Sequence, residues 1–179
     1  MDRPRVLVVS CVRTRGGRDR FYCVRSDGGE TAWSFASYGQ GLPHDLVHLV
    51  VESAFGLRDG FYGRVDRGHD VARINADANR SGGKDKYRGF GDDLSGLLLA
   101  EELANLPWWN PDTTADELAA CAVDLGTRDA ADPARITSIR GELVRTREAW
   151  IALPDRGALR FCFFPDEPRA GFPLRVLQD

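Results

Sequence analysis

The chain has 179 residues, of which 42% are hydrophobic, and this is enough to bury a core without disulfides or a structural metal. Its 24 basic and 27 acidic residues leave a formal net charge of −3, so no overall positive field attracts a phosphate backbone, and we expect no nucleic-acid partner. The four cysteines form no CxxC pair and no apolar run is long enough for a signal peptide or a membrane span, so we expect one cytoplasmic domain over residues 1–179 without a membrane partner.

The first half of the chain predicts strands followed by one clear helix. Three runs rich in β-branched and aromatic residues, separated by glycine-containing turns, predict an antiparallel meander. These strands are expected over residues 5–14, 20–26 and 31–38. Pro43 is suited to the first position of a helix and Gly56 to its end, which predicts a helix over residues 43–55.

The second half predicts mainly helices. The glycine-punctuated segment after Gly56 allows either a short helix or a strand, and residues 75–91 have the polar, glycine-rich composition of a mobile loop. Caps and apolar runs predict helices over 92–105, 114–125 and 133–150, with strands at 158–164 and 174–177. The order of these elements predicts an α+β fold, in which the N-terminal meander and the C-terminal strands form one antiparallel sheet packed against about four helices.

The helix over residues 43–55 carries one narrow polar stripe. At about 100° per residue, His44, Asp45, His48 and Glu52 fall within roughly a third of its circumference, and apolar residues occupy nearly all the rest. We therefore expect the helix to be largely enclosed, with the stripe facing a cleft. Because buried polar side chains are costly unless they pair with each other or with a metal, this stripe is the expected functional surface.

The spacing of the two histidines suits a metal ligand pair. His44 and His48 are four residues apart, so their imidazoles project from adjacent helical turns and can converge on one cation. The segment His44-Asp45-Leu46-Val47-His48 resembles the HExxH helix of zincin metallopeptidases, with Asp45 in place of that family's glutamate base. The resemblance implies Zn²⁺ or another divalent ion on the two histidines, with Asp45 as the catalytic proton acceptor.

A third ligand is required, and the sequence offers two. Glu52 lies on the same helix but about 12 Å along the axis from His44, so its alternative role is to orient His48 from behind. His69 lies in a glycine-flanked segment that is able to fold back over the helix. The order His48, then His69-Asp70, also resembles metal-dependent phosphohydrolases of the HD type, but that family is all-helical and the first forty residues here predict strands.

These residues predict a metal-dependent hydrolase, a zinc enzyme that cleaves peptide or amide bonds of a small-molecule or peptide substrate. The competing hypothesis is a non-catalytic accessory domain that docks a protein partner through the polar helix face or the Trp108-Trp109 corner. That hypothesis predicts a well-solvated histidine stripe and an exposed apolar patch near the tryptophans. Cys11 and Cys23 lie in strand-like runs and are interpreted as structural thiols.

Overall fold

The computed structural model of the protein describes residues 4–36, 39, 41–78, 94–127, 131–167, 169 and 172–177, with the backbone alone for 75–78. The elements are, in chain order, β1 (Leu7–Val12), β2 (Arg18–Val24), β3 (Glu30–Ala36), α1 (His44–Phe55), α2 (Phe61–Asp66), α3 (Val71–Ala78), α4 (Ser95–Ala104), α5 (Ala115–Asp124), α6 (Pro133–Ala152), β4 (Ala158–Phe163) and β5 (Arg175–Val176).

The five strands form one antiparallel sheet in the order β3-β2-β1-β4-β5. The N-terminal meander supplies three neighbouring strands, and β4 returns from the end of the chain to pair with β1 along its whole length, from Leu7 opposite Phe163 to Val12 opposite Ala158. The two residues of β5 add a short edge next to β4. The structure thus confirms the predicted α+β fold and the origin of its sheet.

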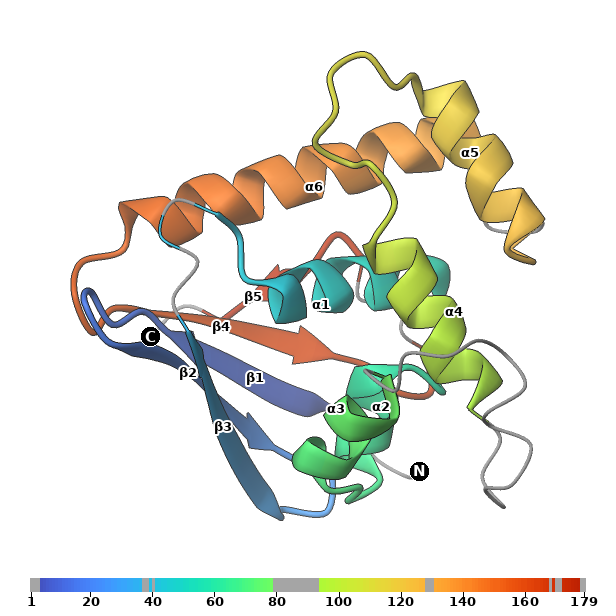
Figure 1. Cartoon of the computed structure of the whole chain (residues 1–179). Coiled ribbons are helices and arrows are strands. Elements are labelled where there is room, and N and C mark those ends of the chain that lie inside the picture. The colour runs from blue at the N-terminus through green and yellow to red at the C-terminus, as the bar shows by residue number, and fades with distance from the viewer. Residues whose placement is uncertain are drawn as a thin grey trace.

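The helices cover one face of this sheet (Figure 1). Residues alternate between the two faces of a strand, and in β1 the inward positions Leu7, Val9 and Cys11 are fully buried. Phe21 and Cys23 continue this buried face on β2. One hydrophobic cluster joins these side chains to apolar residues of α1, α4, α5 and α6. The main core therefore lies between the sheet and the helical layer.

Helix α1 lies in the middle of the molecule. In Figure 1 it runs directly over the strands, with α6 beyond it, and it also packs against α4. Every residue from Leu46 to Phe55 is buried. The helix follows Pro43 and ends at Gly56, which adopts φ 72° in the left-handed region that glycine tolerates. The predicted helix over 43–55 is confirmed, and it is as enclosed as its apolar circumference predicts.

Two short helices, α2 and α3, fill the segment whose structure the sequence left open between helix and strand. Gly63 permits a close approach within α2, since a Cβ there would lie 1.9 Å from the carbonyl oxygen of Arg58, whereas Gly68 adopts φ 84° in the turn after this helix. Of the predicted loop over 75–91, residues 75–78 belong to α3 and residues 79–91 lie outside the described part of the chain.

The three later helices are confirmed close to their predicted positions as α4, α5 and α6. Residues 92 and 93, where the first of them was expected to begin, lie outside the described residues. None of the described helices combines the length and the apolar character that crossing a bilayer requires.

Candidate metal centre

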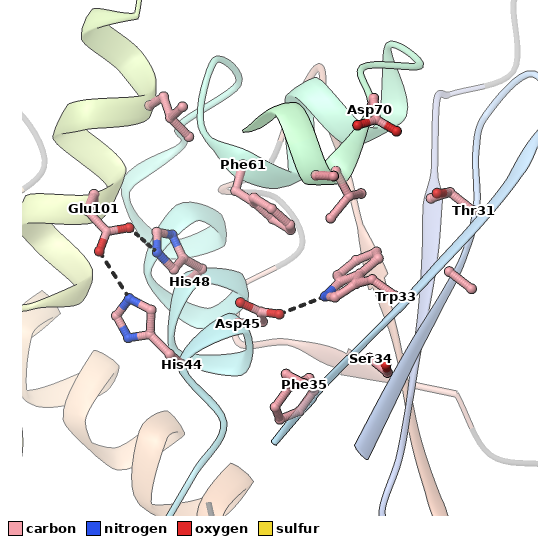
Figure 2. A pocket seen from close by; sticks show the side chains of 14 residues that line it. Thr31, Trp33, Ser34, Phe35, His44, Asp45, His48, Phe61, Asp70 and Glu101 are labelled. Carbon is pink, nitrogen blue, oxygen red and sulfur yellow. Dashed lines mark hydrogen bonds and ion pairs between the residues drawn. The ribbon is translucent and has the colours of Figure 1, made fainter. Parts of the chain in front are cut away.

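Three side chains converge where α1 meets α4 (Figure 2). The Glu101 carboxylate contacts both histidines of α1: its Oε1 lies 3.4 Å from Nε2 of His44, and its Oε2 lies 3.0 Å from Nε2 of His48. One donor atom from each of the three residues lies within 4.8 Å of the other two. The two imidazole rings are perpendicular, with centroids 4.8 Å apart. The histidine spacing therefore does bring both rings to one point, and a carboxylate meets them there.

Helix α4 delivers Glu101 because that residue lies on the helix face turned toward the core. Leu97 and Ala104, one turn on either side, are both buried, so Glu101 interrupts an apolar stripe at helical spacing. Asn105, one turn later, donates from its Nδ2 to Oε1 of Glu101 at 2.8 Å. The packing of this stripe against α1 places the carboxylate over His44 and His48.

Glu52 lies behind His48. Its Oε1 is 3.1 Å from Nδ1 of His48, on the opposite side of the ring from Glu101. The side chain is fully buried, and its carboxylate accepts hydrogen bonds from the backbone N–H groups of Phe61 at 2.9 Å and Tyr62 at 3.0 Å. Glu52 thus fixes the ring of His48 and directs Nε2 toward Glu101 and His44.

The first turn of α2 approaches the Glu52 carboxylate so closely that a side chain at Gly60 has no room. A Cβ on Gly60 would lie 2.6 Å from the carboxylate carbon of Glu52 and from one of its oxygens. The backbone of Gly60 has φ −74°, which any residue adopts, so the requirement for glycine comes from this contact and not from backbone strain.

The electrostatics of the cluster favour a charged pair in the absence of metal. Burial by itself lowers the pKa of His48, but hydrogen bonds to Glu101 and Glu52 and the charges of both carboxylates outweigh burial and raise it from 6.5 to about 9. Hydrogen bonds from His44 and His48 hold the pKa of Glu101 well below its usual range. At neutral pH, His48 is therefore an imidazolium between two carboxylates, and a metal ion would have to displace its Nε2 proton.

Asp45 lies beside this cluster, in a pocket of about 510 Å³ that His44, His48 and Glu101 also line. Its Oδ2 accepts a hydrogen bond of 2.8 Å from the indole N–H of Trp33. Its backbone carbonyl accepts a second hydrogen bond, of 2.8 Å, from the Tyr62 hydroxyl. Asp45 is not among the residues whose donor atoms meet in the described metal-ligand group.

The structure brings three of the residues that the sequence singled out to one pocket and leaves the other two outside its described lining. His44, His48 and Asp45 share one pocket. Neither residue proposed as the third ligand belongs to the described group: Glu52 contacts the far nitrogen of His48, and His69 is a half-buried residue after α2 that is absent from the described pocket lining. The third member is Glu101, which the sequence analysis missed. Its signal was a carboxylate within the apolar stripe of the predicted helix 92–105.

The two surfaces of the competing docking hypothesis differ in exposure. The polar stripe is enclosed along most of its length, since His48 is 5% exposed and Glu52 is fully buried. At the tryptophan corner, Trp108 is buried and donates from Nε1 to the carbonyl of Leu103 at 2.8 Å. Trp109 is 46% exposed, and the guanidinium of Arg147 lies 5.7 Å from the centre of its ring. A docking role for Trp109 stays a prediction.

The buried thiols are poor candidates for nucleophiles or ligands. Burial raises the pKa of Cys11 and raises that of Cys23 to about 12, so both thiols remain protonated at neutral pH.

Comparison of the chain with protein-family models, with curated proteins and with solved structures finds no match. The likeness to zincins therefore rests on the five residues from His44 to His48, and function is argued from the site itself.

Proposed function

We propose that the protein is a metal-dependent hydrolase in which His44, His48 and Glu101 hold Zn²⁺ or a related divalent ion. The observation that supports this most directly is the meeting of three donor atoms within 4.8 Å at the wall of a pocket. Two imidazoles and one carboxylate are a ligand set of catalytic zinc sites, which keep a fourth position for water or substrate.

The surroundings of the cluster suit such an ion. Ligating histidines usually donate their second ring N–H to a carboxylate or a carbonyl, and Glu52 is in position to accept that proton from His48. A set of two nitrogens and one oxygen favours zinc over the harder ions Mg²⁺ and Ca²⁺, which prefer oxygen ligands alone. These two features support Zn²⁺ as the first ion to test.

The chemistry that follows is hydrolysis. A bound divalent ion supplies a water of lowered pKa and polarises a carbonyl group. With such an ion bound, Asp45 would serve as the proton acceptor, because its carboxylate lines the same pocket and the Trp33 indole restrains it. The proposal that the substrate is an amide or a peptide rests on the resemblance of residues 44–48 to the zincin helix.

Metal content is the decisive measurement. Tag-free protein prepared without chelator and offered Zn²⁺ is compared by mass spectrometry with the His44→Ala/His48→Ala double variant and with Glu101→Gln. Glu102→Gln serves as the matched control, because Glu102 is the neighbouring carboxylate on α4 but is exposed. We expect about one equivalent of zinc in the wild type and in the control, none in the double variant and much less in Glu101→Gln.

Absence of metal from the wild type, even after Zn²⁺ and Fe²⁺ are offered, would overturn the proposal and leave a closed histidine–carboxylate network. The catalytic part is tested separately with Asp45→Asn on a panel of amide substrates. This variant is expected to keep zinc and to lose about 100-fold or more in kcat. Equal loss of zinc and activity would instead make Asp45 a structural residue of the site.

A further inference from the structure

The pocket extends well beyond the metal-ligand cluster, and its far part differs in chemistry from the metal end. Inward-facing residues of β3 form one wall, and the start of α3 and part of α4 complete the rim. Figure 2 shows Thr31 beyond Trp33 from the two histidines, and Asp70 above Trp33 in the same view. A volume of about 510 Å³ is large enough for a small organic ligand that also reaches the metal end.

An aromatic wall lies between the two ends and is held in place by its own contacts. Trp33 stacks on Phe21 with ring centroids 5.1 Å apart and an angle of 5° between the planes, and it meets the edge of Phe61 at 5.5 Å. Its indole N–H is fixed on Asp45. Phe35 lines the same wall from β3. Because these rings are already ordered, an apolar group can pack against them with little loss of side-chain entropy.

The charged groups of the lining are all acidic or histidine. Asp45, Asp70 and Glu101 contribute carboxylates, and among the described residues that line the pocket there is no lysine or arginine. Asp70 is fixed at the start of α3, where its Oδ1 accepts a hydrogen bond of 2.9 Å from the backbone N–H of Arg73. A bound divalent ion offsets two of the three negative charges, so the pocket keeps a negative balance beyond the metal.

We infer that this pocket takes neutral or cationic carbonyl compounds that carry an aromatic or branched aliphatic group, and that it disfavours phosphate and carboxylate ligands. The inference rests on the proposed function, since the carbonyl is bound at the metal end. The apolar group packs on Trp33, Phe35 and Phe61, and a cationic tail lies toward Asp70. An anionic group at the far end would face the Asp70 carboxylate, and the described lining offers no lysine or arginine to neutralise it. The resulting charge repulsion disfavours anionic ligands.

Four hydroxamates, which share one zinc-binding group, test the inference on zinc-loaded wild-type protein by isothermal titration calorimetry. Benzohydroxamate against acetohydroxamate measures the contribution of the aromatic wall. The 4-aminomethyl and 4-carboxy derivatives of benzohydroxamate measure the sign of the charge that the far end accepts. We expect the aromatic probe to bind about tenfold tighter than acetohydroxamate, and the aminomethyl probe at least about tenfold tighter than the carboxy probe.

The outcomes separate this inference from the proposed function. Failure of the protein to take up either Zn²⁺ or Fe²⁺ overturns both. Zinc uptake with equal or tighter binding of the carboxy probe, or with no preference for the aromatic probe, overturns the inference and leaves the metal site intact.

A charge introduced at the rim provides a second test. Ala72 is an exposed residue of α3 that lines the pocket, and Ala120 is an exposed alanine of α5 that does not appear in its described lining. We expect Ala72→Arg to reduce or reverse the preference for the aminomethyl probe, whereas Ala120→Arg leaves it unchanged. An equal effect of both variants would show that the preference reflects the overall charge of the protein, and would overturn the assignment to this pocket.

Discussion

At the scale of single residues, the site depends on how His48 is held between two carboxylates. Glu52 contacts its Nδ1 from inside the core, and Glu101 contacts its Nε2 from the side of the pocket. The Glu52 carboxylate is fully buried and accepts hydrogen bonds from two backbone N–H groups. These hydrogen bonds hold it on the core side of the His48 ring, away from the pocket side where Glu101 lies. In the proposed metal site, Glu52 would therefore act through His48, as a positioning residue rather than as a ligand.

Replacement of Glu52 by glutamine is expected to weaken zinc binding by about 10- to 100-fold, because the amide accepts the Nδ1 proton less strongly and orients the ring less firmly. The same change leaves a poorer partner for the backbone N–H groups of Phe61 and Tyr62, and we expect it to lower the free energy of unfolding by about 1–3 kcal/mol. Zinc affinity is measured by competition with a chromogenic chelator, with Glu102→Gln as the control. Unchanged affinity in Glu52→Gln would contradict the positioning role.

The raised pKa of His48 predicts how the stability of the metal-free protein depends on pH. The folded value of about 9 lies above the ordinary value of 6.5, so the folded state binds the proton more tightly than the unfolded state. This contribution to stability is fully present below about pH 6.5 and is lost as the pH rises through about 9. Urea unfolding in the presence of chelator should therefore show stability falling over this range, and falling less steeply in His48→Gln. Parallel pH profiles for the two proteins would show that His48 does not carry the effect.

At the scale of elements, the start of α2 and the side chain of Glu52 on α1 form one unit. The contact is close because Gly60 has no side chain, and a Cβ at this residue would lie only 2.6 Å from the Glu52 carboxylate. The short α2 helix thus supports the inner end of the His48 network, although it contributes no side chain to the described metal-ligand group.

Gly60→Ala is expected to displace Glu52 from the first turn of α2, to reduce zinc affinity and to destabilise the fold by about 1–3 kcal/mol. Gly141→Ala is the matched control, because the nearest atom to its Cβ is the end of the flexible Arg145 side chain at 3.3 Å, within a long helix where alanine is favoured over glycine. Thermal unfolding and the zinc competition assay measure both effects. If both glycine variants behave alike, the close approach at Gly60 does not position Glu52.

At the scale of the whole molecule, the candidate centre joins two helices that are far apart in the chain. His44 and His48 lie in the first half of α1, and Glu101 lies in α4. Helices α2 and α3 separate α1 from α4 along the chain. A metal ion bound to these three residues would cross-link the two helices in the folded state alone. Binding and folding are therefore coupled.

Added Zn²⁺ is expected to raise the melting temperature, by an amount that corresponds to about 2.7 kcal/mol when free zinc is about 100 times its Kd. The effect should be absent in the His44→Ala/His48→Ala variant, reduced in Glu101→Gln and retained in Glu102→Gln, while Mg²⁺ should have little effect on any of them. Differential scanning calorimetry across a zinc titration measures this. Equal stabilisation of the wild type and the double histidine variant would place the zinc elsewhere on the protein.

The elements near the site were predictable from sequence because their signals are local. Pro43, Gly56 and an almost fully apolar circumference specify α1, and alternation of residue types specifies the strands of the meander. The spacing of His44 and His48 follows from helix geometry alone, so their convergence was predictable as well. The segment after Gly56 was ambiguous because Gly60 and Gly63 resemble chain breakers, whereas they permit close contacts with Glu52 and with the backbone of Arg58.

The sequence alone thus determined the fold class, the central helix and two members of the candidate ligand group, since each depends on residues within a few turns of one another. Only the tertiary structure decided that Glu101 faces the histidines, that Glu52 lies behind His48 and that His69 lies outside the described group. These outcomes depend on how α4 and α2 pack against α1, and packing is set by apolar contacts between elements distant in the chain. The partner of a carboxylate on a helix therefore depends on which face of that helix packs inward.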